Sequence, residues 1–94
     1  MPIQQRPLGD LISVGPAMLR DFQLLGIRTV KQLAHRNPAM LYQQLCRTIG
    51  QHVDICCQDV FSAAVAQARD PLLPDEQCQW WHWSRQRKAA NARS

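Results

Sequence analysis

The groups with the clearest chemical potential in this sequence are backbone N–H groups near Val14-Gly15-Pro16. This tripeptide predicts a tight turn with a helix starting at the proline, where a missing N–H costs nothing. The N–H groups of Gly15 and Ala17 then lie at the positive end of the helix dipole, which favours a bound phosphate. Arg20 lies one helical turn further on and adds a cation. Because such contacts involve only phosphate, they predict DNA binding without sequence preference.

The same turn has a purely structural interpretation, a compact connection between two helices. Phosphate-binding turns of this kind often have a second glycine at the position of Ser13. Such turns also often have a lysine at the position of Ala17. Both departures weaken the prediction of phosphate binding, so the two interpretations stay open from the sequence.

The C-terminal stretch is the second candidate for phosphate contacts. Seven basic and seven acidic residues precede it, so the net charge of +4 arises entirely from Arg85, Arg87, Lys88 and Arg93. Four phosphate contacts would give a salt slope of roughly −3.6 on duplex DNA. A solubilising terminus explains the same composition. Because residues 84–94 are polar and lack an apolar face, we expect a basic, flexible tail or a frayed helix.

Cysteines and histidines supply enough ligand atoms for a zinc site, and Cys78 and His82 are spaced to face one metal from a helix. However, no Cys-x-x-Cys knuckle is present, and adjacent residues of a helix point in different directions. Buried, reduced thiols are the simpler interpretation. We therefore expect no metal at this set, which comprises Cys46, His52, Cys56, Cys57, Cys78 and His82.

Trp80, Trp81 and Trp83 cannot all face one way on a helix. We expect two of them to close the bottom of the core and the third to be partly exposed. The functional alternative is a platform on which a base or a planar drug stacks.

No arrangement of side chains predicts catalysis. The sequence lacks a close acid pair, a nucleophile beside a base, a phosphate-binding glycine loop and a metal-protease pattern. No apolar run approaches the roughly 18 residues of a membrane span, and the first residues lack the apolar segment of a signal peptide. We expect a cytoplasmic protein that is not an enzyme, with no cofactor, small-molecule substrate or membrane association.

Helices must position these groups, because helix-favouring residues dominate and no stretch alternates with period two. We expect Thr29, Asn37 and Asp54 to cap helix starts and Gly26 and Gly50 to end helices. A chain of 94 residues is expected to form one domain. The prediction is an all-α, compact five- to six-helix domain over residues 7–83, with helices near 7–12, 16–25, 30–35, 38–48, 55–69 and 75–83.

Residues 8–34 resemble helix-hairpin-helix segments, and residues 8–83 are similar to a family of small bacterial proteins, the pathogenicity locus family. Some of its members are labelled mitomycin-resistance proteins. The resemblance implies a helical domain built on a helix-hairpin-helix unit, without an established activity. It rests on Val14-Gly15-Pro16, Leu25-Gly26-Ile27, Leu41-Tyr42, Leu45-Cys46, Asp54-Ile55-Cys56, Asp59-Val60-Phe61, Ala63-Ala64-Val65 and, most specifically, Trp80-Trp81-His82-Trp83.

Two main hypotheses follow. The first is a helix-hairpin-helix module that binds DNA weakly without sequence preference, through the phosphate contacts of the turn and the tail. The second is a protein-interaction or scaffold module that has lost nucleic-acid binding, as the charge-neutral body and the surplus tryptophan suggest. A third, drug sequestration, rests on the family label and the tryptophans.

Overall fold

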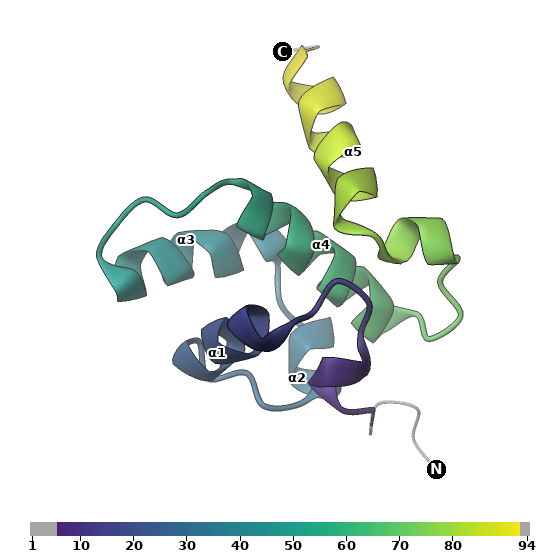
Figure 1. Cartoon of the computed structure of the whole chain (residues 1–94), viewed down its shortest axis with the longest axis horizontal. Coiled ribbons are helices and arrows are strands. Elements are labelled where there is room, and N and C mark those ends of the chain that lie inside the picture. Colours follow the sequence, from purple (N-terminus) through teal and green to yellow (C-terminus); the bar gives the residue numbers. More distant parts are fainter. Residues whose placement is uncertain (1–5, 93–94) are drawn as a thin grey trace.

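In the computed structural model, which describes residues 6–92, the chain is all-helical as predicted and contains no strand in that range. Helix α4 is central and packs against α2, α3, α5 and η3. Figure 1 shows α5 directing its C-terminal end away from the other helices. The elements in chain order are η2 (Leu8–Asp10), α1 (Pro16–Leu24), α2 (Val30–Ala34), α3 (Pro38–Ile49), α4 (Cys56–Arg69), η3 (Asp75–Cys78) and α5 (Trp80–Ala92).

Capping groups confirm the predicted starts of α2 and α3 and the predicted ends of α1 and α3. Thr29 and Gln32 form a reciprocal capping box at the start of α2. The Asn37 side chain accepts hydrogen bonds from two N–H groups at the start of α3. Gly26 and Gly50 follow α1 and α3 with φ of 75° and 80°, a left-handed conformation that glycine adopts without strain.

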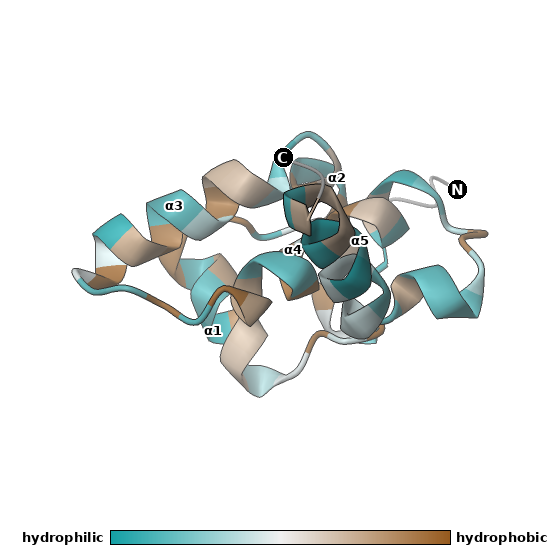
Figure 2. Ribbon diagram, turned by 90° about the horizontal axis from the view of Figure 1, so that it is seen from above, coloured by the Kyte–Doolittle hydropathy of each residue, from teal (hydrophilic) through white to brown (hydrophobic). Residues whose placement is uncertain are grey.

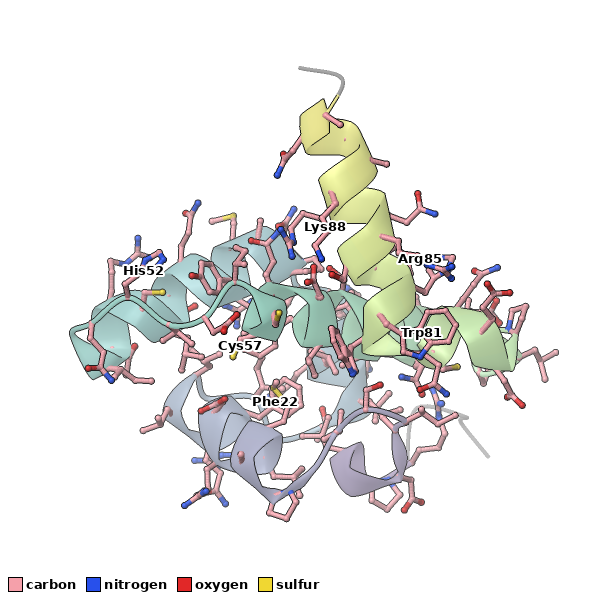
Figure 3. All side chains as sticks on the ribbon, turned by 45° about the horizontal axis from the view of Figure 1, so that its top comes forward. Phe22, His52, Cys57, Trp81, Arg85 and Lys88 are labelled. Carbon is pink, nitrogen blue, oxygen red and sulfur yellow. The ribbon has the colours of Figure 1, made fainter. Side chains whose placement is uncertain are left out.

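One apolar core connects the helices. Phe22 of α1 and Phe61 of α4 are fully buried with ring centroids 5.8 Å apart, and Figure 3 shows Phe22 pointing into the space between the helices. On α3, Tyr42 is buried whereas Ile49 is 40% exposed. Other core residues are Met18, Leu25, Ile27, Val30, Leu33, Leu41, Leu45, Ala64, Val65 and Ala68.

Two predicted helices differ from the structure. The segment near 7–12 forms only the short 3-10 helix η2. The segment near 75–83 is divided into η3 and α5, and α5 continues to Ala92 instead of ending at Trp83. The expected tail is therefore helical over residues 84–92, although its strongly hydrophilic turns (Figure 2) gave no apolar pattern to predict it. Arg93, the last predicted tail cation, lies outside the described residues.

Candidate nucleic-acid interface

The turn between η2 and α1, which we call the hairpin turn (residues 12–17), depends on an unusual serine. Ser13 has φ of 73°, the left-handed conformation that side-chain-bearing residues adopt at a cost of about 1–2 kcal/mol. Its hydroxyl donates to the Cys78 carbonyl and accepts from the Trp80 N–H, both at 3.2 Å. Ser13 thus keeps the backbone conformation expected of a glycine and also joins the turn to the start of α5.

Gln67 of α4 holds the same turn from inside the domain. This side chain is only 5% exposed. Its amide accepts from the Ile12 N–H and donates to the Ile12 carbonyl, each at 2.8 Å. Its Nε2 also reaches the carbonyls of Ala63 and Cys78 at 3.1 and 3.4 Å. One buried amide therefore links α4, the hairpin turn and η3.

Gly15 and Ala17, the predicted phosphate donors, are both exposed. Within residues 6–92 neither backbone N–H has a hydrogen-bond acceptor. Gly15 has an ordinary φ of −107°, and a Cβ added there would meet no heavy atom within 4 Å. The fold itself therefore does not require a glycine at this position. The turn leaves its two N–H groups and the space before them open to solvent.

Arg20 is exposed on α1, one turn beyond these N–H groups. Arg28, in the connection after α1, and Lys31, in the first turn of α2, are also exposed. None of the three forms a salt bridge with another described residue. Asp21, the acidic neighbour of Arg20, is half-buried, and the desolvation raises its pKa. The region around α1 and the start of α2 therefore supplies cations that the fold does not neutralise by direct pairing.

Helix α5 uses Arg87 for folding. The Arg87 guanidinium donates two hydrogen bonds of 2.9 Å, one to each carboxylate oxygen of Asp59 on α4. The Asp59 side chain is 1% exposed and that of Arg87 18%. The hydrogen bonds to Asp59 raise the pKa of Arg87. Two of the five guanidinium N–H donors of Arg87 are therefore already bound to a buried carboxylate, which makes Arg87 a weaker candidate for a phosphate contact than its charge suggests.

The two other predicted contacts on α5 lie at the surface. The Arg85 guanidinium is 4.7 Å above the centre of the Trp81 ring and forms an exposed ion pair with Glu76 at 3.3 Å. Lys88 is exposed and forms no salt bridge within the described residues. Figure 3 shows Trp81 and Arg85 on the same side of α5. The structure thus separates Arg85 and Lys88, which are exposed, from Arg87, whose side chain is only 18% exposed.

The tryptophans are more exposed than expected. Trp80 and Trp81 leave 40% and 41% of their surface in solvent. Trp83 is half-buried, and its indole N–H donates to the Gln77 carbonyl at 2.8 Å. The prediction that two tryptophans close the core is wrong, because none of the three is buried, whereas Cys78 and Ser84 on either side of them are.

The cysteines show no arrangement that holds a metal. No group of three or more metal-ligating side chains gathers in residues 6–92. Burial raises the pKa of the Cys57 and Cys78 thiols, and the hydrogen bond with the Asp54 carboxylate raises that of Cys56. A raised pKa keeps these thiols protonated and poorly reactive near neutral pH.

Sequence reasoning missed Ser13, Asp59 and Gln67 as the residues that connect the hairpin turn and α5 to α4. Asp59, Ala63 and Gln67 follow one another at four-residue steps, so they share a face of α4. Two polar residues on one face with a small residue between them indicate a buried polar contact with a neighbouring helix. The spacing of Asp59 and Gln67 could have indicated a buried polar contact, but it did not identify Arg87 and Ile12 as their partners.

Comparisons with known proteins identify relatives of this chain. Residues 4–89 match the model of the pathogenicity locus (Cdd1) family. The chain belongs to the pathogenicity locus family. It is also 37% identical, over 82 residues, to the mitomycin resistance protein McrB of Streptomyces lavendulae. That alignment covers 86% of this chain and 73% of the relative. No solved structure matches the chain.

The part that matches the pathogenicity locus family contains the hairpin turn, the Asp59–Arg87 pair and the tryptophans. The family match therefore includes both the hairpin turn and the exposed tryptophans. It confirms the resemblance to the pathogenicity locus family that the sequence motifs predicted. Within the described part of the chain, no helix combines the length and apolar character that a bilayer crossing requires.

Proposed function

We propose that the hairpin turn is a helix-hairpin-helix element that binds DNA backbone without sequence preference. The observation that carries the proposal is the pair of exposed, unpaired N–H groups of Gly15 and Ala17 at the start of α1. N–H groups at a helix N-terminus favour anions through their dipoles and through direct hydrogen bonds. This function requires no catalysis and is consistent with a location in the cytoplasm.

The environment of Gly15 supports this proposal. Its φ of −107° is open to any residue, and a Cβ would find empty space. A glycine that the fold does not require is explained when a ligand approaches the backbone closely from outside. Ser13, which weakened the prediction from the sequence, is no obstacle because it already has a positive φ.

Fluorescence anisotropy with an unrelated-sequence DNA duplex at low salt tests the proposal. We expect a Kd in the range of about 10⁻⁴–10⁻⁶ M that weakens steeply as salt is added. Because Arg87 is occupied by Asp59, the salt slope should be shallower than four tail contacts would give. No binding near ~100 μM, or binding that ignores salt, would contradict the proposal.

Substitutions at the turn give matched controls. Gly15→Ala should leave thermal stability equal or slightly higher while weakening DNA binding, because its Cβ occupies the space of the phosphate. Ala17→Lys should strengthen binding and Ala17→Asp should abolish it, although the added carboxylate suits a helix N-terminus and should not destabilise α1. If all three variants bind like the unmodified protein, the hairpin turn is not the contact surface.

A protein-interaction module is the second candidate. Exposed tryptophan and arginine are enriched at the centres of protein interfaces, and Trp80, Trp81 and Arg85 are exposed together at one end of the domain. An affinity pull-down that returns one stoichiometric protein, lost with Trp81→Ala, would favour this candidate. Recovery of nucleic acid alone would exclude it.

The name of the Streptomyces relative adds drug binding as a separate candidate. The structure offers an open pocket of about 320 Å³ lined by Leu8, Gly9, Leu19, Gln23, Ile27 and Arg28. This volume is at the lower end of the range of small-molecule sites. Specific binding of a mitomycin should raise the melting temperature, and the increase should grow with the logarithm of the drug concentration above the Kd. An unchanged melting temperature at saturating drug would remove this candidate.

A further inference from the structure

The exposed tryptophans lie beside the hairpin turn. The backbone N–H of Trp80 donates a hydrogen bond to the Ser13 hydroxyl at 3.2 Å. Gly15 follows two residues after Ser13, a reach of at most about 7 Å along the chain. A strand whose phosphate is held at Gly15 can therefore reach the start of α5 within a few nucleotides.

Trp81 and Arg85 offer two flat groups at this place. Arg85 lies 4.7 Å above the Trp81 ring, yet 41% of the Trp81 surface remains in solvent. Trp80, the preceding residue, is 40% exposed. Aromatic rings and guanidinium planes both stack on nucleobases, and such stacking ignores base identity.

Charge favours a nucleic acid over an acidic or neutral protein surface as the occupant. Residues 80–92 include Arg85, Arg87 and Lys88 and contain no acidic residue. Asp59 neutralises Arg87, but Arg85 has only an exposed partner, Glu76, and Lys88 has no salt bridge among the described residues. An exposed ion pair is worth no more than about 1 kcal/mol, so a phosphate can displace the Glu76 carboxylate.

We propose that Trp80, Trp81 and Arg85 form a base-stacking surface, so that the preferred ligand is DNA with unpaired bases rather than continuous duplex. This proposal rests on the function proposed for the hairpin turn, which it makes more specific. The hairpin turn holds the backbone, and the tryptophan surface holds bases that duplex DNA would keep inside its own stack. Bases in a duplex are already stacked and cannot reach the indole rings without an unstacking cost of a few kcal/mol.

The test compares three fluorescein-labelled ligands by anisotropy. These are a deoxythymidylate oligomer of about 12 nucleotides, within the range of one single-strand module, an abasic oligomer of the same length, and a blunt duplex. We expect the thymidylate oligomer to bind most tightly. Trp81→Ala should weaken its binding roughly tenfold and leave the blunt duplex nearly unaffected. Leu72→Ala, which removes an apolar side chain that is 88% exposed, is the control.

Glu76→Gln gives a test with the opposite sign. This substitution removes the carboxylate that competes for Arg85 while leaving the fold intact, since Glu76 is exposed. We expect the thymidylate oligomer to bind about two- to fivefold more tightly. A substitution that merely damaged the domain would weaken binding instead.

The possible failures are distinguishable. If the abasic oligomer binds as well as thymidylate, or if Trp81→Ala has no effect, phosphate contacts explain all binding and only the stacking proposal is overturned. If no oligomer and no duplex binds, the function proposed for the hairpin turn is overturned as well. A protein partner that depends on Trp81, in a chain without affinity for thymidylate, would also overturn the stacking proposal.

Discussion

The hairpin turn and helix α5 contain the two sets of predicted phosphate contacts, and the fold leaves the donors of the turn open but commits one cation of α5 to an internal partner. In the hairpin turn the N–H groups of Gly15 and Ala17 point to solvent without partners. In α5 the guanidinium of Arg87 is committed to the buried carboxylate of Asp59. A positive charge counted in the sequence is therefore a weaker sign of ligand binding than a donor that the folded protein leaves unpaired.

The two regions are also connected. Ser13 links the turn to the first residue of α5, and Gln67 links the turn to α4. The exposed N–H groups thus belong to a turn whose neighbouring backbone is held rigidly from inside. A site prepared in this way loses less conformational freedom when a ligand binds.

The largest effect is expected when the Asp59–Arg87 pair is broken. Arg87→Ala leaves the Asp59 carboxylate buried without its partner, and the free energy of unfolding should fall by about 3 kcal/mol or more. Urea denaturation followed by tryptophan fluorescence measures this change. The exposed pair gives the control, since Glu76→Gln should alter stability by less than about 1 kcal/mol.

A combined variant sharpens this test. Replacing both members with apolar residues, as in Asp59→Leu with Arg87→Met, should restore much of the stability lost by Arg87→Ala, because no charge remains buried alone. If Arg87→Ala alone is as stable as the unmodified protein, the packing of α5 does not depend on the Asp59–Arg87 pair.

An intermediate effect is expected at Gln67. Gln67→Ala removes the partners of the Ile12 N–H and carbonyl and should cost about 2–3 kcal/mol in unfolding free energy. Amide chemical shifts near Ser13 and Gly15 should move as the turn loosens, and DNA binding should weaken. The exposed Gln86→Ala is the control. Unchanged amide shifts in the turn would contradict the link between α4 and the hairpin turn.

The smallest effect is expected at Ser13, where two contributions oppose each other. Ser13→Ala loses both hydroxyl hydrogen bonds and keeps the strained backbone, so it should cost about 1–2 kcal/mol. Ser13→Gly loses the same hydrogen bonds but relieves the strain, so it should be about 1 kcal/mol more stable than the alanine variant. Thermal denaturation of the two variants measures the difference. Equal stabilities would mean that the positive φ is not strained.

Local sequence signals predicted a large part of the fold. Thr29 and Asn37 start helices because their side chains accept backbone N–H groups, and Gly26 and Gly50 end helices because they reach a positive φ. These signals act over a few residues, so they need no knowledge of the partner helices. The sequence left a flexible tail and a frayed helix open for residues 84–94, because this part of α5 is held by the buried Ser84 and the Arg87–Asp59 ion pair rather than by apolar side chains.

For the hairpin turn, the sequence by itself determined the turn, the helix that starts at Pro16 and the cations near it. Only the tertiary structure decided which donors stay open. Residues 55 positions apart, Ile12 and Gln67, meet in the fold and fix the turn, and a carboxylate 28 positions away binds two of the guanidinium donors of Arg87. The physical reason is that a polar group binds a ligand only if folding has not already satisfied it, and the satisfying partners are distant in sequence.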